Sequence, residues 1–370
     1  MAMEFLFNFI GANQGFFIPL AKIVAVLAVL LPMVAYAVLA ERKISALIQD
    51  RVGPNRVALP FIGSIPILGR FLTRLGFWQP MADGVKSFLK EDFTPDHVRK
   101  IYFWLAPAIA LVPAFMTMAV IPFGSYLGSQ KMVVADLNVG ILYTFGIVSL
   151  GVYGIVLAGY AANSKFPFLG GIRSTAQLIS YEIAMGMSVV PLFMLVGDLN
   201  LGKVIDYQSE GITSWLIFKQ PVAFMIFMVA AFAETNRLPF DLPESESELV
   251  GGYHTEYSSM KFALFFMGEY SNMIASSAMM VTLFLGGWTL PFFGLNVPPD
   301  AGAPLWAGLI HIAIFLTKVA VLMALFIWVR WMLPRFRYDQ LMDLGWRRFI
   351  PLALANIVIT AVILFLQARP

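Results

Sequence analysis

The sequence predicts an all-α fold: a polytopic membrane helix bundle of about eight transmembrane helices, with an interfacial amphipathic helix and structured cytoplasmic loops. Hydrophobic residues make up 59% of the 370 and charged residues 13%, about half the charged share of a soluble chain. Long apolar runs recur along the whole chain, and the connections between them are alternately rich and poor in Lys and Arg. We therefore treat residues 1–370 as a single membrane domain.

Eight apolar runs are each long enough to cross the hydrocarbon core, which takes about 20 helical residues. The first is too long for the apolar part of a signal peptide and lacks a small-residue cleavage site, so we interpret it as a span. The runs extend over 16–40, 101–121, 139–161, 178–197, 214–233, 260–284, 305–331 and 349–367.

The distribution of basic residues predicts an orientation. Most of the 25 Lys and Arg residues fall in the odd-numbered connections, whereas the even-numbered ones hold only Lys131, Lys203 and Lys219. Cytoplasmic connections carry the excess of Lys and Arg in membrane proteins. The odd-numbered connections are therefore predicted to be cytoplasmic, and both termini to lie on the outer face.

The first cytoplasmic connection, residues 41–100, is long and is interrupted by prolines and glycines. Within it Phe77, Met81, Val85, Phe88 and Leu89 recur at helical spacing. Such a stripe is typical of an amphipathic helix that lies in the membrane interface. We expect a helix of this kind over residues 77–89.

Ionisable side chains occur inside the predicted spans, where each costs about 2.5–3.5 kcal/mol on insertion scales. Glu182 and Glu269 lie within spans, Glu234 ends the fifth, and Lys318 and His311 share the seventh. Structural ion pairs between helices would account for one isolated pair. An excess of Glu over intramembrane cations instead favours carboxylates that hold and pass protons. His311 alone we interpret as a packed, hydrogen-bonded residue.

The third cytoplasmic loop, residues 234–259, is unusually acidic for the side of the membrane where basic residues dominate. Apolar side chains and the prolines Pro239 and Pro243 alternate with its acids. A solvated acidic loop would not need so many apolar residues. We therefore expect a folded loop that packs against a partner and turns its carboxylates toward a watery cavity. The acids are Glu234, Asp241, Glu244, Glu246, Glu248 and Glu256.

Polar residues of the first cytoplasmic connection alternate with apolar ones at the membrane surface. This pattern suits the mouth of a tunnel that admits a lipophilic ligand with polar head-group oxygens. It suits a docking surface for a peripheral subunit equally well, and the residues alone do not separate the two. They are Glu41, Arg42, Arg51, Gln79, Asp83 and Lys86.

Composition excludes or disfavours several kinds of site. The chain has no Cys, so it cannot supply thiolates to an iron–sulfur cluster, and its three His residues are scattered, which disfavours a haem. Zinc-ligand spacing and Gly-rich phosphate loops are missing, so we expect neither a metal nor NADH to bind this chain. No nucleic-acid partner is expected.

Five motifs together resemble one family, the H-subunit family of NADH-quinone oxidoreductases, whose mitochondrial counterpart is NADH dehydrogenase subunit 1. The resemblance extends from the first span to the last, and the run 233–258 is its most specific part. Residues 58–77 look lengthened against the family pattern. The motifs are Glu41-Arg42-Lys43, Arg51-Val-Gly-Pro-Asn-Arg56, Gln79-Pro-Met-Ala-Asp83-Gly-Val-Lys86, Arg173-Ser-Thr-Ala-Gln177-Leu-Ile-Ser-Tyr-Glu182 and the run 233–258.

The resemblance implies a subunit at the heel of the membrane arm of respiratory complex I. There it would line the tunnel by which ubiquinone or menaquinone reaches the terminal iron–sulfur cluster of a neighbouring subunit. The implied tunnel and entrance residues are Glu41, Arg42, Arg51, Gln79, Asp83, Lys86, Arg237 and Phe240. The implied path that couples quinone reduction to proton translocation is Glu182, Glu234, Asp241, Glu244, Glu246, Glu248, Glu256 and Glu269.

The same resemblance implies that the chain binds no cofactor and is not catalytic alone, with quinone as the substrate of the complex. FMN and iron–sulfur clusters would belong to partner subunits. The implied partners are cluster-bearing and quinone-site peripheral subunits, small membrane subunits, antiporter-like subunits and membrane lipid. The length of the first loop favours the bacterial inner membrane, and the distribution of basic residues predicts that both termini are periplasmic.

We expect quinone reduction to change the charge beside the acidic loop. The glutamates would pass that change on as coupled titration, Glu234 and Glu246 above all.

The anchor subunit of a membrane-bound hydrogenase is the nearest alternative function, and the Arg-Val-Gly-Pro-Asn-Arg and Glu-Tyr-Ser motifs argue against it. A self-sufficient cation transporter would conduct ions alone in liposomes. A purely structural anchor would not need intramembrane glutamates.

Overall fold

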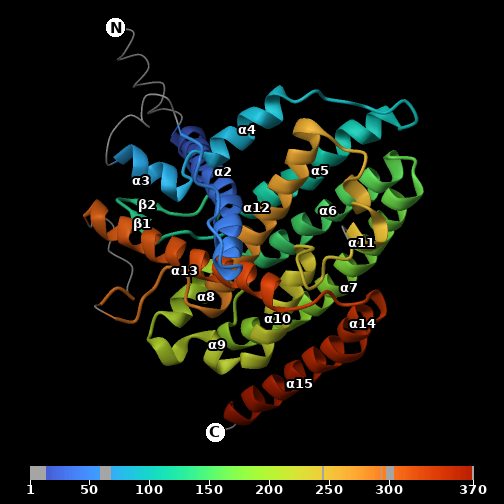
Figure 1. Cartoon of the computed structure of the whole chain (residues 1–370). Helices are drawn as coiled ribbons and strands as arrows, with labels where there is room; N and C mark the ends of the chain where they lie inside the picture. The colour runs from blue at the N-terminus through green and yellow to red at the C-terminus, as the bar shows by residue number, and fades with distance from the viewer. Residues whose placement is uncertain (1–13, 59–67, 244–245, 293, 297–303, 369–370) are drawn as a thin grey trace.

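The computed structural model describes residues 14–58, 68–243, 246–292, 294–296 and 304–368 (Figure 1). Within them the regular structure is helical except for one antiparallel hairpin, β1 (Tyr126–Leu127) and β2 (Gln130–Lys131), in which Tyr126 pairs with Lys131. Six helices of the described chain are long and apolar enough to cross a membrane. The prediction of an all-α polytopic membrane bundle is confirmed.

Each of the predicted spans contains a helix, and shorter helices lie in the connections. The helices of the spans are α2 (Gln14–Ile48), α5 (Lys100–Thr117), α6 (Gly140–Ala161), α7 (Lys165–Val196), α10 (Pro221–Glu234), α12 (Ser259–Phe284), α13 (Leu305–Met332) and α15 (Ile350–Gln367). The short helices are α3 (Leu68–Leu75), α4 (Gln79–Leu89), α8 (Leu201–Gln208), η1 (Ile212–Ser214), α9 (Leu216–Lys219), α11 (Glu246–Leu249), η2 (Gly252–His254), α14 (Tyr338–Asp343) and the π-helical η3 (Leu344–Phe349).

Three predicted boundaries need correction. The helix of the first span does not end at residue 40, because α2 continues to Ile48. The fifth span does not start at residue 214, because Pro221 opens α10 and the preceding residues form the separate short helices η1 and α9. Proline is favoured at the first turn of a helix, and α10, which begins at Pro221, has 14 residues. The fourth span does not start at residue 178, because α7 already begins at Lys165 and continues well beyond its most apolar stretch.

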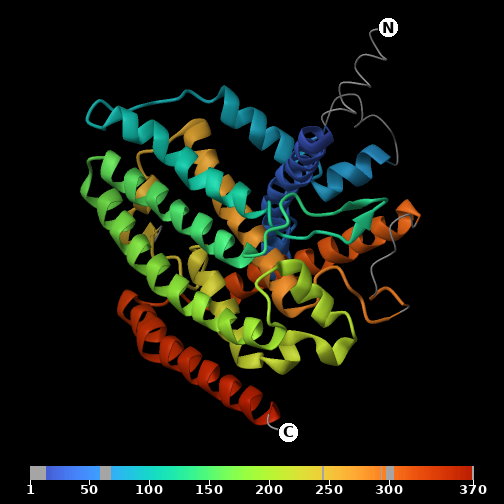
Figure 2. The same ribbon diagram turned by 180° about the vertical axis from the view of Figure 1, so that it is seen from behind.

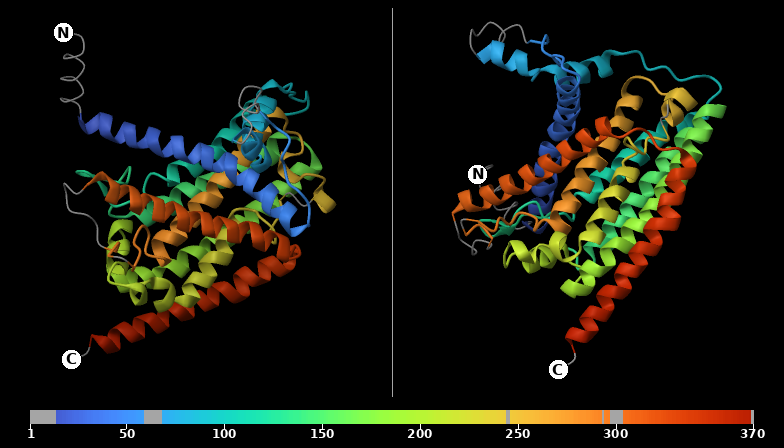
Figure 3. Two further views of the ribbon diagram at one scale, coloured as in Figure 1. Left: turned by 60° about the vertical axis from the view of Figure 1, so that its left-hand side comes forward. Right: turned by 60° about the horizontal axis from the view of Figure 1, so that its bottom comes forward.

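The bundle is arranged around α12 and α10. Helices α5, α6 and α7 run side by side (Figure 2), and α12 packs against α5, α13 and α2. Helix α10 lies between α7 and α12, and α15 follows the outer side of α7 (Figure 3). Close approach of α5 and α6 depends on Gly154, where a Cβ would come within 2.5 Å of the backbone nitrogen of Ala110.

Two polar residues of α13, His311 and Lys318, make hydrogen bonds that support the fold. His311 is 2% exposed, and its Nδ1 lies 2.7 Å from the Ser125 hydroxyl, which confirms a packed, hydrogen-bonded histidine. The Lys318 ammonium donates to the carbonyls of Leu285 and Thr289 at 2.7 and 2.6 Å. A lysine in that position satisfies free carbonyls at the C-terminal end of α12.

The predicted amphipathic helix is present as α4, which buries none of its residues within this chain. Its apolar side chains Met81, Val85, Phe88 and Leu89 are all exposed. An exposed apolar stripe beside the bundle suits a helix that lies in the membrane interface. That location stays a prediction.

Candidate functional site

A cavity of about 900 Å³ opens between α2, α4, α12 and α13, beside the loop that follows α10. Its wall is largely apolar along α2 and α12, with Val34 and Phe266 as examples, and polar near the end of α2. Such a combination suits a ligand with a polar head and an apolar tail. Five of the residues predicted for the quinone tunnel line it: Glu41, Arg42, Arg51, Asp83 and Arg237.

Asp83 of α4 is fixed at the rim of this large cavity. Arg42 Nη1 donates to its Oδ2 at 2.6 Å, and Gln79 Nε2 donates to its Oδ1 at 2.9 Å. Because Arg42 belongs to α2, these bonds tie α4 to the first span. Gln79 therefore acts on the cavity through Asp83, while Lys86 is exposed and does not line the cavity.

Glu41 of α2 is 9% exposed and meets groups from three other segments. Arg330 of α13 donates to its Oε1, and the Tyr270 hydroxyl of α12 donates to its Oε2 at 2.7 Å. Arg237 Nη1 lies 3.6 Å from the same Oε1. A carboxylate this buried is tolerated only with such partners.

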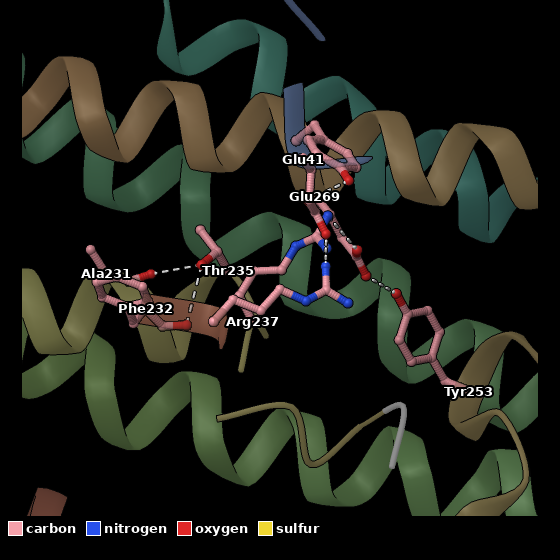
Figure 4. Close-up of polar contacts among 9 residues, drawn as sticks. Glu41, Ala231, Phe232, Thr235, Arg237, Tyr253 and Glu269 are labelled. Carbon is pink, nitrogen blue, oxygen red and sulfur yellow. Dashed lines mark hydrogen bonds and ion pairs between the residues drawn. The ribbon is translucent and has the colours of Figure 1, made fainter. Parts of the chain in front are cut away.

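Arg237, in the loop after α10, lies between two carboxylates. Its guanidinium carbon is 4.3 Å above the Tyr270 ring, and its Nη2 is 3.8 Å from Glu269 Oε2 (Figure 4). The expected excess of Glu over cations inside the bundle is therefore wrong for Glu41 and Glu269. Folding brings Arg237 to both carboxylates and Arg330 to Glu41, which sequence position alone does not show.

The loop reaches this position because α7 holds its backbone. Gln177 is fully buried, and its Nε2 donates to the carbonyls of Ala233 and Phe240 at 2.6 and 2.9 Å. Asn236 has a φ of 49°, a left-handed conformation that asparagine tolerates. The Thr235 hydroxyl donates back to carbonyls of the last turn of α10 (Figure 4). The chain therefore turns sharply and points Arg237 at Glu41.

A small cavity of about 40 Å³, with polar groups set among largely apolar walls, lies on the other side of Glu269. The Tyr253 hydroxyl donates to Glu269 Oε1 at 2.8 Å, and both residues line this cavity. Glu182, Glu234 and Asn272 line it as well. The volume exceeds the roughly 10–15 Å³ that one water molecule needs.

A second small cavity of about 20 Å³ continues from the first, since Glu234 and Asn272 line both. Its other polar walls are the side chains of Thr117, Thr144 and Ser276. Polar groups therefore extend from the large cavity into the middle of the bundle. We call this set the carboxylate row: Glu41, Arg237, Glu269, Tyr253, Glu182 and Glu234.

The remaining predicted coupling acids lie apart from the row. Asp241 pairs with Arg335 at 3.1 Å, and Glu248 pairs with Arg173 at 2.7 Å. Glu256 is half-buried and lines neither small cavity. Asp241 is buried, but none of these acids lines the large cavity or either small one.

Three further predicted residues are placed differently or not at all. Phe240 is buried between Tyr181 and Phe336, with ring centroids 5.7 and 5.5 Å away, and does not line the large cavity. Glu244 lies outside the described residues, and of Glu246 the structure describes only the backbone, at the start of α11. In the described chain no three His, Asp or Glu side chains converge on a metal position.

Sequence reasoning missed four members or neighbours of the row: Tyr270, Arg330, Tyr253 and Asn272. In the sequence, Arg330 counted only as one of the basic residues that predict the topology. A cation near the end of a span usually has a charged partner, and for Arg330 that partner is Glu41. Tyr270 follows Glu269 directly, and Asn272 is polar within a span. In the sequence, Tyr253 looks like one of the apolar residues of the acidic loop, and only the structure shows that its hydroxyl contacts Glu269.

A second polar cluster surrounds a cavity of about 410 Å³ at the opposite end of the bundle. It lies beside β1 and β2, which are labelled in Figure 1. Lys131 Nζ donates to Asp136 at 2.9 Å, and Asn200 Nδ2 donates to the other oxygen at 2.8 Å. The Asn200 amide first, and Lys131 second, hold the pKa of Asp136 below its ordinary value. Burial raises the pKa of Asp206. We call Lys131, Asp136, Asn200, Lys203 and Asp206 the hairpin-side cluster.

Comparison with known proteins gives one consistent result. The sequence profile of the NADH dehydrogenase family matches residues 21–361. One of the H subunits of NADH-quinone oxidoreductase from Cytophaga hutchinsonii is 47% identical over 348 residues, covering 93% of this chain and 96% of that protein. One of the H subunits from Geobacter sulfurreducens is 49% identical, covering 93% and 95%. The H subunit from Flavobacterium johnsoniae is 46% identical, covering 92% and 93%.

Proposed function

Because the chain belongs to the NADH dehydrogenase family, we propose that its large cavity is a quinone passage and that its carboxylate row couples quinone reduction to proton translocation. The chain is a bacterial membrane protein and a membrane subunit of NADH-quinone oxidoreductase, an enzyme complex. One observation carries the proposal. Arg237 contacts Glu41 in the large cavity and Glu269 beside the small one, so a single side chain links the two.

The large cavity supports a quinone ligand through its two kinds of wall. The guanidinium groups of Arg42, Arg51 and Arg237 are permanent donors at its polar end, where quinone oxygens would need them. The apolar faces of α2 and α12 would contact the isoprenoid tail. A volume of about 900 Å³ is at the upper end of what small-molecule sites offer.

The carboxylate row supports coupling because its members share partners. Reduction of a quinone to a quinol consumes two electrons, which a cluster on a partner subunit would supply, and two protons. A change in the charge around Glu41 alters the attraction on Arg237, and Arg237 in turn determines how readily Glu269 holds a proton. Glu182 and Glu234 lie across the small cavity from Glu269 and would receive the effect.

The same proposal covers the partners and the orientation. Cluster-bearing and quinone-site peripheral subunits would cover the cytoplasmic end, where the acidic loop lies, and FMN and iron–sulfur clusters would stay on them. Small membrane subunits and antiporter-like subunits would extend the path sideways in the lipid. Both termini would be periplasmic, because the basic residues of the odd-numbered connections favour the cytoplasm.

A hydrogenase-type anchor is the alternative that shares most of these features. It would keep the carboxylate row but would not need a large cavity open along α2 and α12. The identity of nearly half the residues to chains named as quinone oxidoreductase subunits argues against it. A stand-alone transporter is the other alternative. The purified chain in liposomes would conduct ions if it were such a transporter, and it should be inert if it is a subunit of this enzyme.

The quinone passage is tested by photo-crosslinking a ubiquinone analogue to membranes that contain the assembled complex. Labelling that a tunnel-blocking inhibitor suppresses is expected between residues 41 and 90, or in the loop after α10. Labelling without NADH, and labelling with excess unreactive quinone, are the controls. An active, assembled complex that shows no labelling of this chain would contradict the quinone passage.

The coupling path is tested by Glu234→Gln, which keeps the shape of the side chain but removes the proton it can carry. We expect the protons translocated per electron to fall, because Glu234 lines both small cavities. Glu210→Gln, at an exposed acid near the hairpin-side cluster, is the matched control. If Glu234→Gln left the ratio unchanged in assembled complex, the relay role of Glu234 would be wrong.

A further inference from the structure

Tyr253 contacts Glu269 of the carboxylate row, and both residues line the small cavity. The residue lies in η2 and is 1% exposed. Its hydroxyl donates to Glu269 Oε1 at 2.8 Å (Figure 4), and its side chain lines the small cavity with Glu182 and Glu234. The ring is held edge-on against Phe265, with centroids 5.4 Å apart.

Glu269 has two carboxyl oxygens with different neighbours. Oε2 faces Arg237 at 3.8 Å, and a guanidinium has only donors, so it cannot take a proton from Glu269. Oε1 faces the Tyr253 hydroxyl, which both donates and accepts. Glu269 lines the small cavity itself, and a second route for proton exchange between Glu269 and the interior runs through the phenol.

Building on the proposed function, we infer that the Tyr253 hydroxyl passes protons between Glu269 and the small cavity that Glu182 and Glu234 line. Protonated Glu269 gives its proton to the phenol oxygen while the phenol gives its own proton to a water or carboxylate in the cavity. The tyrosine ends neutral, as it began, and no electron moves. Tyr253 is a relay for the coupling path and does not touch quinone.

Tyr257 provides a matched control four residues later. It also packs edge-on against Phe265, at 4.9 Å, and it stacks on Phe103 at 4.0 Å. Its hydroxyl has no hydrogen-bond partner among the described residues, and it lines neither small cavity. Removing either hydroxyl leaves a phenyl ring against Phe265, and Tyr253→Phe in addition removes the hydrogen bond to Glu269 at the small cavity.

The experiment compares Tyr253→Phe and Tyr257→Phe in the assembled complex, in inverted membrane vesicles, at equal complex content. NADH-driven quinone reduction and proton uptake are measured in H₂O and in D₂O. For Tyr253→Phe we expect turnover to fall at least about tenfold, since a positioned proton-transfer group contributes about 10²–10⁴-fold. We also expect a larger solvent isotope effect, because proton transfer then limits turnover. Tyr257→Phe should match the unmodified complex in both.

A relay also predicts how variants combine. Once Glu269→Gln has removed the proton donor, adding Tyr253→Phe should cause little further loss, because the two act in series. If the losses of turnover in Glu269→Gln and Tyr253→Phe added in the double variant, and Tyr253→Phe left the solvent isotope effect unchanged, Tyr253 would be a packing residue and the inference would be overturned. Turnover and isotope effect in Tyr253→Phe equal to those in Tyr257→Phe would also overturn it.

These variants distinguish the relay role of Tyr253 from the proposed role of the carboxylate row as the coupling path. If Glu234→Gln lowers proton translocation while Tyr253→Phe behaves like Tyr257→Phe, the coupling path stands and the phenol relay falls. If Glu234→Gln, Glu269→Gln and Tyr253→Phe all translocate protons normally, the carboxylate row is not the path.

Discussion

The carboxylate row and the hairpin-side cluster contain similar side chains at opposite ends of the bundle, yet they are built differently. Arg237 and Glu41 have side chains only 8% and 12% exposed, whereas those of Lys131 and Asp136 are 56% and 40% exposed. Glu41 and Arg330 are 289 residues apart in sequence, but Lys131 and Asp136 are 5 apart. The row joins distant helices in the interior. The charged pair of the cluster closes a local turn at the surface, and Asn200, 64 residues from Asp136, attaches that turn to α8.

This difference decides what each group of charges can do. In the interior, removing one member of a pair leaves a charge without solvent, which costs about 3–5 kcal/mol. At the surface, water and salt screen the charges, and a pair contributes about 0–1 kcal/mol. Only the buried row can therefore transmit a change of charge across several helices. The following variants test that distinction, starting from the largest expected effect.

Arg237→Gln should have the largest effect, because it removes a guanidinium that faces both Glu41 and Glu269. We expect a loss of about 3–5 kcal/mol in stability and quinone reduction at least about tenfold lower, about 1.4 kcal/mol or more in the barrier. The measurements are the midpoint of thermal unfolding of the purified chain in detergent and NADH-driven quinone reduction per assembled complex.

Arg237→Lys is the control for charge alone. A lysine keeps the positive charge but loses the planar group that stacks on Tyr270. It should recover much of the stability and only part of the activity. If Arg237→Gln left the midpoint of thermal unfolding and the rate of quinone reduction unchanged, the buried row would contribute no more to stability or activity than a surface ion pair does.

Much of the fold could be predicted from the sequence, because membrane solvation leaves clear patterns. Each predicted apolar run contains a helix, and six helices of the described chain are long and apolar enough to cross a membrane. The start of α10 was missed, since an average over an apolar run hides the effect of one Pro221. The end of α2 was missed for a related reason: the helix continues past the polar Glu41 as far as Ile48.

The site was predictable by residue type but not by contact. Acids inside spans, such as Glu269, are recognisable because they are costly there. What joins them depends on the path of the loop that carries Arg237, and no spacing in the sequence predicts that path. Phe240 was assigned to the tunnel with its loop, yet its ring packs inward against Tyr181. The hydroxyl of Tyr253 became informative only with Glu269 beside it.

Gln177→Leu should have the next largest effect, because it releases the loop that carries Arg237. The variant leaves the buried carbonyls of Ala233 and Phe240 without their amide donor, at a cost of about 1–3 kcal/mol. We expect thermal unfolding at lower temperature and a reduced rate of quinone reduction per assembled complex.

Gln208→Leu is the matched control at the other end of the bundle. Gln208 is 1% exposed, donates to the carbonyl of Thr282 and accepts from the backbone of Gly286. Its loss should cost similar stability with little change in quinone reduction. Equal activity losses in the two glutamine variants would mean that activity follows general stability rather than the loop.

Asn200→Ala should have a smaller effect, confined to the hairpin-side cluster. Asn200 caps α8 by accepting from the backbone of Gly202 at 2.8 Å, and losing such a cap costs about 1 kcal/mol. It also removes the main cause of the lowered pKa of Asp136. A lowered pKa stabilises the fold above the ordinary value of 3.8 and stops doing so as the pH falls through the folded-state value. The deficit of the variant in thermal unfolding should therefore shrink in acid, with quinone reduction unchanged near neutral pH.

Lys131→Met should have the smallest effect, because Lys131 and Asp136 are both largely exposed and Asn200 remains on the second carboxylate oxygen. A surface pair of this kind contributes about 0–1 kcal/mol, and added salt should remove the difference in thermal unfolding. Proton translocation per electron should match that of the unmodified complex. A lower ratio in Lys131→Met would break the comparison, because it would place an exposed ion pair on the proton path. The exit from the interior would then have to be sought around the cavity that Asp136 and Asp206 line.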